Sequence, residues 1–539
     1  MSGSETLEFD YVIVGAGSAG CVLADRLSQD RDVSVCVLEA GGSDNKAVIK
    51  TPMLLQFAIT NPAINWDYWT EPQKNLKDRA LYWPRGKTLG GSSSINAMHY
   101  MRGALENYDE WESAYGATGW DGDAALEAFK AVENNENHGA PFHGQGGPLN
   151  VKTIGPLNPL THRYFEACRR RQIPENDDHN GARQEGFGTY QVTQKGGKRW
   201  SAADAFLKPA MQRPNLTVVT GALAHKVVLE NGTAQGVLIE VKGELKTIQA
   251  RREVILSGGA INSPQLLLLS GIGPADHLIE TGIDVIHDMP GVGENLHDHL
   301  VARLQVAVHG NVDLYDQFRL DKAAFHVIRA YLFGSGLGAS FPLEAGCFIK
   351  TRPELAAPDI QCNFVPALIP TTHLPFAKSP FGYKHGFYHG IHQTQPESRG
   401  WLKLKSRDPF APPRMTANYL ATEGDRRAMR DGVKIQRDVL KEAPMAKHIA
   451  AELQPGPDVQ SDSEIDAWIR RVGDTVYHPV GTCKMGIDDR AVVDPRLKVR
   501  GIDSLRVADA SIMPIINGSN TNAPTIMIAE KCADMIRTG

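Results

Sequence analysis

The chain has 539 residues, of which 42% are hydrophobic and 22% charged, and its formal net charge is -5. This length exceeds what one hydrophobic core usually carries, so we expect two domains or one large domain with a substantial insertion. The mildly negative charge gives no reason to expect a polyanionic partner, and we predict no nucleic-acid ligand.

The N-terminus reads MSGSETLEFD, with acids where a signal peptide would have a basic region and an apolar run. The longest later apolar run, around Leu266 to Leu269, is far shorter than the roughly 20 residues that span a bilayer. Seven cysteines lie in apolar contexts with no CxxC pair, a pattern typical of buried thiols in a reducing compartment. We therefore predict a cytoplasmic protein without a metal site.

The first predicted unit, from Phe9 to Gly42, has the order strand, glycine-rich turn, helix and strand. An apolar run from Tyr11 to Val14 predicts a short buried strand, and the helix that follows should end near Ser28. A second strand is expected from Val33 to Leu38. This order is typical of a dinucleotide-binding unit.

The glycines of the turn have GxGxxG spacing, at Gly15, Gly17 and Gly20. Gly15 allows the tight turn, Gly17 lets the backbone approach a pyrophosphate, and Gly20 lets the helix pack close to the strand. The helix N-terminus then directs its free N–H groups at the phosphates. Glu39, after the second strand, is placed to accept hydrogen bonds from ribose hydroxyls. The spacing leaves open which dinucleotide binds.

Two segments follow that could form part of a nucleotide-binding site. A long aromatic segment from Thr51 to Pro84 is either a cover over a bound cofactor or an irregular surface loop. The next stretch, from Arg85 to Asp109, gathers glycines, serines and an asparagine. Many small donors and free N–H groups in one place suit a phosphate or a flat polar ring.

Further along, helices and strands alternate. A helix is expected from Asp121 to Asn134, and a turn-rich break from Pro141 to Gly147. Asn231-Gly232 is a hairpin signal inside a meander of strands. The meander strands are expected at Leu216 to Thr220, Val227 to Leu229, Gly236 to Val241 and Glu253 to Leu256.

From His299 to about Gly473 the glycine-rich segments stop. Alternating segments such as Gln361 to Val365 and Gly400 to Lys405 suit an antiparallel sheet, so we take this region as a substrate domain. A cluster on one of its expected strands, His385, His389 and His392 with Gln393, either lines a pocket or faces solvent, and we favour solvent.

One C-terminal residue is a candidate for chemistry. His478 lies in Tyr-His-Pro-Val-Gly-Thr, where proline and glycine fix the backbone, and an imidazole with a pKa of roughly 6.5 can act as a base. Its plain alternative is a structural histidine.

The chain carries five stretches that resemble the glucose-methanol-choline oxidoreductases. GKTLGGSSSIN from Gly86, with Tyr100, Gly103 and Asp109 downstream, is similar to the family's first signature. GAINSPQLLLLSGIG from Gly259 is similar to the second. The C-terminal stretches are Tyr477 to Gly486, Val492 to Pro514 and Asn520 to Lys531. The most similar branches are bacterial choline-dehydrogenase-type and aliphatic or polymeric alcohol dehydrogenases.

This resemblance implies an α/β FAD-binding Rossmann-like domain of the glutathione-reductase type. It also implies an α+β substrate domain with an antiparallel sheet. The FAD-binding domain is expected to be discontinuous, over residues 1–155, 215–298 and 474–539. The substrate domain then comprises residues 156–214 and 299–473.

The implied cofactor is non-covalent FAD. Covalent members attach flavin through a histidine at the position of Ile95, and isoleucine cannot form that bond. Asp509 follows the expected strand Ser504 to Ala508 and resembles the carboxylate that meets the ribityl or pyrophosphate part of FAD, while Val227 is expected to reach the adenine through its backbone. The implied FAD-binding residues are Gly15, Gly17, Ser18, Gly20, Glu39, Ala40, Trp69, Arg85, Gly86, Leu89, Gly90, Ser92, Asn96, Ala97, Met98, Val227, Asp509, Ala510 and Asn522.

The implied reaction is oxidation of a primary alcohol to an aldehyde. His478 is expected to take the hydroxyl proton while hydride passes to flavin N5. Asn520 matches the family's second active-site position, where an amide cannot act as a base but its N–H can hold the substrate oxygen as charge develops; its plain alternative is a turn asparagine. Glu344 and Tyr477 are the expected substrate contacts. Glu344 matches a carboxylate common in the choline-oxidising branch, and also in relatives that oxidise neutral alcohols.

Several alternatives remain at this point. The reduced flavin passes electrons either to a quinone or membrane carrier, which is compatible with a peripheral membrane contact, or to oxygen as in an alcohol oxidase that releases hydrogen peroxide. We favour the external acceptor. A light-driven fatty-acid decarboxylase of the same family lacks histidine at the position of His478, and a non-catalytic flavin-binding protein would not need both candidate residues. The oligomeric state is left open.

Overall fold

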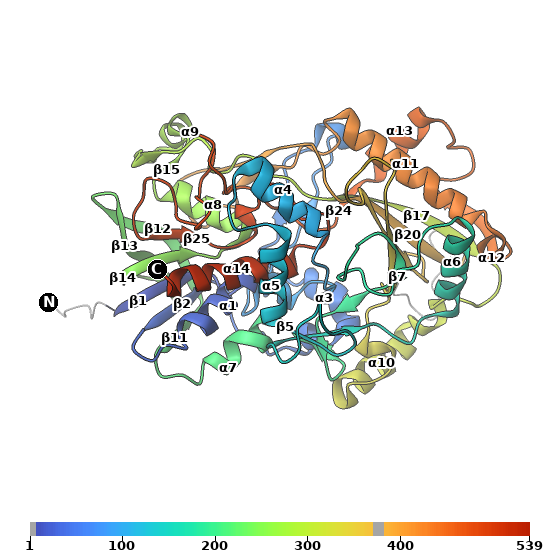
Figure 1. Cartoon of the computed structure of the whole chain (residues 1–539), viewed down its shortest axis with the longest axis horizontal. Coiled ribbons are helices and arrows are strands. Elements are labelled where there is room, and N and C mark those ends of the chain that lie inside the picture. Colours follow the sequence, from blue (N-terminus) through green and yellow to red (C-terminus); the bar gives the residue numbers. More distant parts are fainter. Residues whose placement is uncertain (1–6, 370–381) are drawn as a thin grey trace.

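The computed structural model describes residues 7–369 and 382–539. Two seven-stranded sheets form its frame. In Figure 1 the first sheet, with β1 and β14, lies on the left beside helix α14, and the second, with β17 and β20, lies on the right. The functional site lies where the two halves meet.

The first sheet has the strand order β11, β2, β1, β14, β13, β12, and β25 pairs with β14. Parallel pairing joins β11, β2, β1, β14 and β25, while β12 and β13 are antiparallel to their neighbours. Strands buried on both faces need apolar side chains throughout, as in the YVIV run that ends β1. The strands are β1 (Leu7–Val14), β2 (Val35–Glu39), β11 (Leu216–Thr220), β12 (Ala222–Glu230), β13 (Thr233–Val241), β14 (Glu244–Leu256) and β25 (Leu505–Val507).

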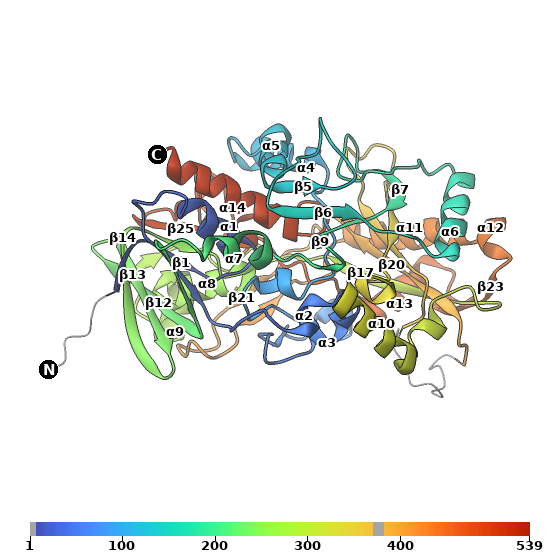
Figure 2. The same cartoon turned by 90° about the horizontal axis from the view of Figure 1, so that it is seen from below.

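Two helices from opposite ends of the sequence pack together on this sheet. They are α1 (Ser18–Leu27) and α14 (Asn522–Arg537), which lie side by side in Figures 1 and 2. Ser18 Oγ donates a hydrogen bond to Asn522 Oδ1 at 2.8 Å. Arg26 pairs with Glu530 at 2.8 Å. The end of the chain is therefore part of the opening nucleotide unit.

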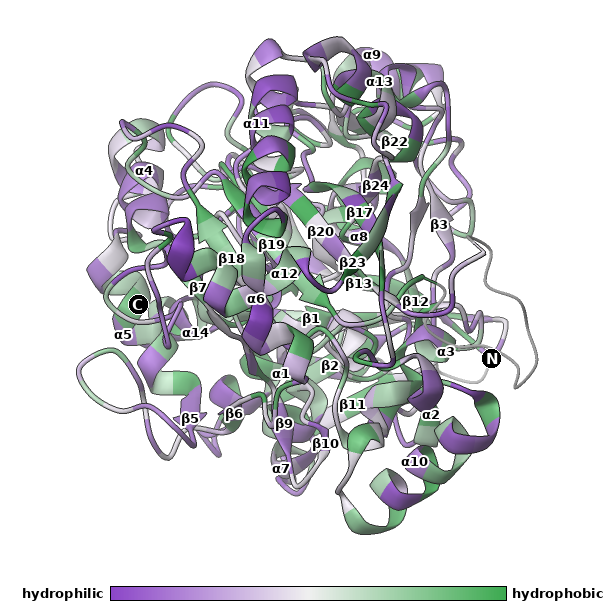
Figure 3. Ribbon diagram, turned by 90° about the vertical axis from the view of Figure 1, so that its right-hand side faces the viewer, coloured by the Kyte–Doolittle hydropathy of each residue, from purple (hydrophilic) through white to green (hydrophobic). Residues whose placement is uncertain are grey.

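The second sheet is antiparallel throughout, with the order β23, β17, β20, β19, β18, β7 and with β24 beside β17. Helices α11 and α6 cover one face, and Figure 3 shows them in front of β18, β19 and β20 with hydrophilic outer surfaces. The elements are α6 (Pro159–Arg170), β7 (Gly186–Thr189), β17 (Leu300–Val308), β18 (Ala345–Ile349), β19 (Ile360–Val365), β20 (Gly386–Gln393), α11 (Glu423–Leu440), β23 (Ile449–Gln454) and β24 (Asp474–Thr475).

The remaining helices and short strands lie outside the two seven-stranded sheets. They are α2 (Ala47–Lys50), η1 (Pro52–Leu54), α3 (Leu55–Ile59), β3 (Tyr68–Trp69), η2 (Lys74–Leu76), β4 (Tyr82–Trp83), η3 (Gly91–Ser94), α4 (Leu105–Tyr115), α5 (Gly122–Val132), β5 (Glu133–Asn135), β6 (Leu149–Thr153), β8 (Gln191–Val192), β9 (Gln194–Lys195), β10 (Lys198–Arg199), η4 (Ala203–Leu207), α7 (Lys208–Ala210), α8 (Gly259–Leu269), β15 (Ile272–Gly273), α9 (Ala275–Glu280), β16 (His287–Asp288), η5 (Tyr315–Gln317), α10 (Leu320–Phe333), η6 (Leu337–Ala339), β21 (Trp401–Lys403), β22 (Arg414–Thr416), α12 (Ala443–Ala446), α13 (Asp462–Val472) and η7 (Ala510–Ile512).

The expected fold class is confirmed, as are the opening strand, helix and strand and the hairpin at Asn231-Gly232. The segment expected at Gly400 to Lys405 forms β21, which pairs with β22 in a separate two-stranded sheet. The first sheet takes all its strands from the predicted FAD-binding segments, whereas β24 of the second sheet falls outside the predicted substrate segments. The domain limits stay a prediction. All seven cysteines are buried and free, as expected.

Helix α10 has an apolar outer face. Phe325, Ile328, Leu332 and Phe333 are each more than half exposed. Figure 2 shows α10 near α2 and α3. Within residues 7–369 and 382–539, no helix combines the length and the apolar character that crossing a bilayer requires.

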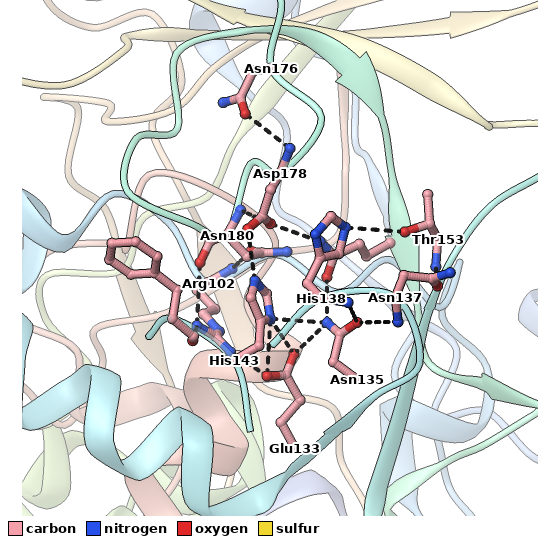
Figure 4. A network of polar contacts seen from close by, with 12 residues as sticks. Arg102, Glu133, Asn135, Asn137, His138, His143, Thr153, Asn176, Asp178 and Asn180 are labelled. Carbon is pink, nitrogen blue, oxygen red and sulfur yellow. Dashed lines mark hydrogen bonds and ion pairs between the residues drawn. The ribbon is translucent and has the colours of Figure 1, made fainter. Parts of the chain in front are cut away.

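A buried polar network ties β5 to the segment around Asp178 (Figure 4). Arg102 Nη2 lies 2.6 Å from Glu133 Oε2, and both side chains are almost fully buried. His143 joins two carboxylates, with Nδ1 3.1 Å from Glu133 and Nε2 2.8 Å from Asp178. Burial raises the pKa of Glu133, but the His143 hydrogen bond and the Arg102 charge outweigh it and hold that pKa below its ordinary value. The network therefore depends on charge as well as on hydrogen bonds.

We predict that Glu133→Gln destabilises the protein because it leaves the Arg102 guanidinium buried without a counter-charge. Removing one partner of a buried ion pair costs about 3–5 kcal/mol, so the thermal midpoint should fall by several degrees. The lowered pKa means that Glu133 contributes above its unfolded pKa and loses this contribution as pH falls through the folded pKa. The gap between parent and variant, measured by calorimetry, should therefore close in acid.

Glu127→Gln on α5, the helix that directly precedes Glu133, is the control, because Glu127 is exposed and pairs with Lys130 at the surface. Exposed pairs contribute roughly 0–1 kcal/mol, so this variant should unfold close to the parent. Equal midpoint shifts for the two variants would contradict the role given to the network.

Candidate functional site

One cavity of about 970 Å³ is lined by residues of both sheets. At one end it meets the carboxyl ends of β1 and β2, where ligands bind in open parallel sheets. At the other end it meets β17, β19 and β20, with α10 and η1 along its side. Its volume is at the upper end of ligand pockets, which suits an extended cofactor with space for a second molecule.

The opening turn leaves backbone space inside this cavity. A Cβ atom on Gly20 would lie 1.8 Å from the Gly15 oxygen, so Gly20 is required by packing alone. A Cβ on Gly91 would lie 2.7 Å from Gly17 Cα, because the two backbones face each other closely. A Cβ on Gly17 would instead meet its nearest protein atoms only at 4.0 Å. Gly17 is therefore the glycine whose missing side chain leaves room for a ligand.

The N-terminus of α1 faces the same space. Its N-cap, Gly17, has no side chain to accept from the first N–H groups of the helix. Such free N–H groups bind phosphates readily. Glu39 accepts hydrogen bonds from Ala16 N–H at 2.9 Å and Gly41 N–H at 2.7 Å, and burial raises its pKa to about 7. The glycine turn, the helix N-terminus and this carboxyl group together fit a dinucleotide.

A second buried carboxyl group comes from the C-terminal part of the chain. Asp509 accepts hydrogen bonds from Gly259 N–H at 2.8 Å, Ser263 Oγ at 2.6 Å and Ser511 N–H at 2.8 Å. Burial raises its pKa above the ordinary value, and these bonds act against that shift. Asp509 therefore joins β25 to the start of α8 at the wall of the cavity.

His478 and Asn520 lie side by side in the cavity wall, with Asn520 Nδ2 3.3 Å from His478 Nε2. The other ring nitrogen, Nδ1, lies 3.0 Å from Nδ1 of His299. His299 Nε2 is 2.6 Å from the carbonyl oxygen of Thr394. This places His299 between a main-chain acceptor and His478.

These contacts determine the tautomers. A carbonyl oxygen can only accept, so His299 must carry its proton on Nε2 and present a lone pair at Nδ1. His478 must then donate from Nδ1, which leaves the lone pair on its Nε2. Burial lowers the pKa of His299 to about 4, and burial, with the nearby His299 and His392, holds the pKa of His478 well below its ordinary value. The cavity therefore contains a neutral imidazole whose basic nitrogen faces Asn520.

The backbone around His478 is fixed from three sides. Its N–H donates to Asp298 Oδ1 at 2.7 Å. The preceding residue, Tyr477, has φ 71, a left-handed conformation that non-glycine residues adopt only where the surroundings impose it. Arg85 Nη2 donates to the Tyr477 carbonyl oxygen at 2.6 Å. The imidazole is thus held in one place before any ligand binds.

Most of the residues expected to hold a cofactor or substrate line the cavity. They are Gly15, Gly17, Ser18, Glu39, Ala40, Arg85, Gly86, Ser92, Asn96, Ala97, Met98, Tyr477, His478, Asp509, Ala510, Asn520 and Asn522.

Six expected residues lie outside the cavity lining: Gly20, Trp69, Leu89, Gly90, Val227 and Glu344. Trp69 is 56% exposed, and Trp66 lines the cavity in its place. The Val227 N–H donates to Ser270 Oγ at 2.8 Å, and Ala222 to Ala224 of the same strand line the cavity. Glu344 is buried and accepts hydrogen bonds from Asn158 N–H and Thr161 Oγ.

The histidine cluster differs from the expectation of solvent exposure, which is wrong for His389 and His392. His389 is fully buried against Tyr164 and Phe364. His392 is 1% exposed and lines the cavity. Strand alternation points these two side chains to opposite faces of a sheet that is covered on both sides. His385 precedes the strand and pairs with Asp313 at 2.8 Å.

Sequence reasoning missed His299 and Asn363, and for His392 it favoured solvent over a pocket. None of these residues lies in a recognisable motif, and all depend on strand pairing that brings β17, β19 and β20 together. For His299 there was one available signal, a histidine directly before a long apolar strand.

Comparisons with known proteins agree with this geometry. Two family models described as GMC oxidoreductase match residues 9–301 and 396–529. The chain is 45% identical to alcohol dehydrogenase [acceptor] from Pseudomonas putida, over 98% of this chain and 95% of the relative. It is 43% identical to oxygen-dependent choline dehydrogenase from Rhizobium etli, over 98% of this chain and 96% of that protein.

Solved structures give the same result. Pyridoxine 4-oxidase from Mesorbium loti has a TM-score of 0.89 at 31% identity, covering 98% of this chain and 99% of that one. Formate oxidase has a TM-score of 0.91 at 27% identity, covering 99% of both chains. From these matches along nearly its whole length, we conclude that the chain belongs to the GMC oxidoreductase family, whose enzymes bind FAD.

Proposed function

We propose that this flavin-dependent oxidoreductase oxidises a primary alcohol to an aldehyde, with His478 as the base. The observation that carries the proposal is the neutral imidazole in the cavity wall, whose unprotonated Nε2 lies 3.3 Å from the Asn520 amide nitrogen. An alcohol hydroxyl placed there meets one acceptor and one donor. The relatives named for alcohol and choline oxidation support the same reaction.

In this proposal the protein groups act on the hydroxyl. His478 Nε2 accepts the hydroxyl proton, and the Asn520 N–H donates to the oxygen as negative charge develops. The His478 Nδ1–H bond to His299 persists in both protonation states, so the ring keeps its orientation. FAD, when bound, supplies the acceptor for the hydride that leaves the alcohol carbon.

We propose that FAD is held, without a covalent bond, by the cavity-lining residues of the glycine turn, the segment from Arg85 to Met98 and the C-terminal residues Asp509, Ala510 and Asn522. Ile95 is buried at the cavity wall and has no nucleophilic atom. The free N–H groups at the start of α1 suit the pyrophosphate.

Gly17→Val should give folded protein without flavin. Its Cβ would have room among the protein atoms but would occupy the space that a pyrophosphate needs. The measurement is the flavin absorbance of the purified variant, with circular dichroism to verify folding. Gly42→Ala is the control, because a Cβ there meets no described atom within 4 Å. A yellow, fully loaded Gly17→Val protein would refute this use of the turn.

The cavity favours a neutral alcohol over a quaternary ammonium substrate. Among the described residues that line it, the carboxylates are Glu39, Asp474 and Asp509. Glu39 lies at the glycine turn and Asp509 is held by three hydrogen bonds, while Asp474 pairs with Arg303 at 3.1 Å. The substrate side is lined largely by apolar residues of α10 and η1. A cation would meet no free carboxylate there.

His478→Ala should keep FAD bound and slow flavin reduction by alcohol by on the order of a hundredfold or more. Anaerobic stopped-flow reduction measures this step directly. Since the His478 pKa is held well below its ordinary value, the parent rate should stay level as pH falls through 6.5. An unperturbed imidazole base, with a pKa of roughly 6.5, would lose half its activity there. Near-parent reduction in the variant would remove His478 from the mechanism.

For the oxidative half-reaction we propose an external acceptor rather than oxygen. One relative is named for an unspecified acceptor, whereas others are named oxidases or oxygen-dependent. The exposed apolar face of α10 supports a quinone or a membrane-bound carrier, because its inner residues, such as Ala323, Ala324 and Val327, line the cavity. Large exposed apolar patches commonly mark contact surfaces.

Photoreduced enzyme mixed with air-saturated buffer should regain its flavin colour over minutes, more slowly than turnover with alcohol and a quinone or dye. The slow return is expected because oxygen is not the proposed acceptor. Stopped-flow absorbance provides the measurement, and the same reduced enzyme mixed with a soluble quinone anaerobically provides the control. Reoxidation by air faster than turnover would make the protein an alcohol oxidase.

A further inference from the structure

The floor of the substrate side carries a histidine that the proposed reaction does not use. His392 lines the cavity and is 1% exposed, yet neither ring nitrogen has a hydrogen-bond partner in the part of the chain that the structure describes. A buried polar group left without a hydrogen bond costs folding stability. A polar group that stays without hydrogen bonds at a cavity wall therefore points to a ligand that forms them.

A second unsatisfied atom lies on the neighbouring strand. Asn363 of β19 also lines the cavity, and its buried Oδ1 has no partner within the described residues. Asn363 is paired in register with Gly390, two residues before His392 on β20. Such diagonal neighbours have Cα atoms about 7–8 Å apart, which leaves room for one small group between their side chains.

Gly390 adds no side chain to the sheet face that carries these two residues. It lies between Arg303 of β17 and Asn363 of β19 in the strand register. A Cβ on Gly390 would meet its nearest atom, a Val301 methyl, at 3.4 Å, which is an ordinary van der Waals contact, so packing does not require glycine here. The absence of a side chain beside His392 and Asn363 is therefore compatible with a ligand that contacts both.

We propose that His392 and Asn363 form a subsite for a second hydroxyl group of the substrate, so that the enzyme prefers a diol or a longer hydroxylated alcohol. A neutral imidazole offers one donor and one acceptor, and Asn363 Oδ1 offers an acceptor. A hydroxyl can accept from the imidazole N–H and donate to Asn363 Oδ1. A carbonyl or ether can only accept, and would leave Asn363 Oδ1 unsatisfied.

The subsite lies close to the reacting position. The rings of His392 and His478 are 6.0 Å and 5.2 Å from the ring of His299 between them, measured between centroids. Gln361, paired in register with His392, reaches Asn520 Oδ1 at 3.4 Å. One hydroxyl at His478 and another at His392 are therefore compatible with a short carbon chain. This inference rests on the proposed alcohol oxidation, and it adds the substrate class.

The test compares monols with diols of equal length, such as butan-1-ol with butane-1,4-diol, across chains of three to six carbons. After correction for the two ends of a diol, the parent should show a kcat/KM at least about tenfold higher for the best diol. His392→Leu should lower the ratio of diol to monol kcat/KM by about tenfold to a hundredfold. His392→Gln, which keeps a donor and an acceptor, should recover part of the loss.

His385→Gln serves as the matched control, since His385 belongs to the same chain segment but does not line the cavity. This variant should have the same kcat/KM as the parent for both monols and diols. A further readout needs no turnover. Because His392 is unsatisfied, His392→Leu should raise the thermal midpoint of the holoenzyme, whereas loss of a structural histidine would lower it.

Each result separates the two proposals. Equal kcat/KM for monols and diols in the parent, or equal losses for both in His392→Leu, overturns the subsite and leaves alcohol oxidation standing. A lowered thermal midpoint in His392→Leu also overturns it. If no alcohol reduces the flavin, the reaction proposal fails. Titration of the flavin spectrum of the His478→Ala holoenzyme with each diol and monol then still tests the subsite, with tighter diol binding expected and equal binding overturning it.

Discussion

A buried carboxyl group must find hydrogen-bond donors, and at Asp509 this requirement holds the active site together. The donors come from the first turn of α8 and from η7, so the carboxyl ends of β14 and β25 are fixed against each other. The contact between Ser18 and Asn522 adds the first turn of α1. The segments with His478 and Asn520 are thereby placed relative to the glycine turn, and the distance from the glycine turn to His478 does not depend on a ligand.

Burial has a second effect at the histidines. In a dense protein environment the charged imidazolium is disfavoured, so His299 and His478 stay neutral although three histidines lie close together. Hydrogen bonds alone can orient neutral rings. The main-chain carbonyl of Thr394 can only accept, so it fixes which nitrogen of His299, and then of His478, carries the proton. A single backbone oxygen thus determines which nitrogen of His478 carries the lone pair that the proposed reaction uses.

The local parts of this structure could be predicted from the sequence because their signals are local. The apolar run of β1, the glycine spacing and the Asn231-Gly232 turn each specify their own backbone. The positions of side chains around the cavity depend instead on strand register. The cavity is therefore lined by Trp66 and not by the nearby Trp69. In the same way it is lined by Ala222 to Ala224 and not by Val227, which lies further along the same strand. The same dependence also explains why His392 was expected in solvent, since alternation alone does not tell which sheet faces are covered.

The hydrogen bond between Ser18 and Asn522 joins residues 504 positions apart. At a synthesis rate of roughly 5–20 residues per second, the ribosome needs on the order of a minute to make the stretch between them. During that time the opening strand, helix and strand exist without α14 and without β25. The growing chain therefore cannot complete the cofactor site until translation is almost finished, and the apolar surface of α1 that α14 covers must remain protected until then, by transient contacts or by chaperones.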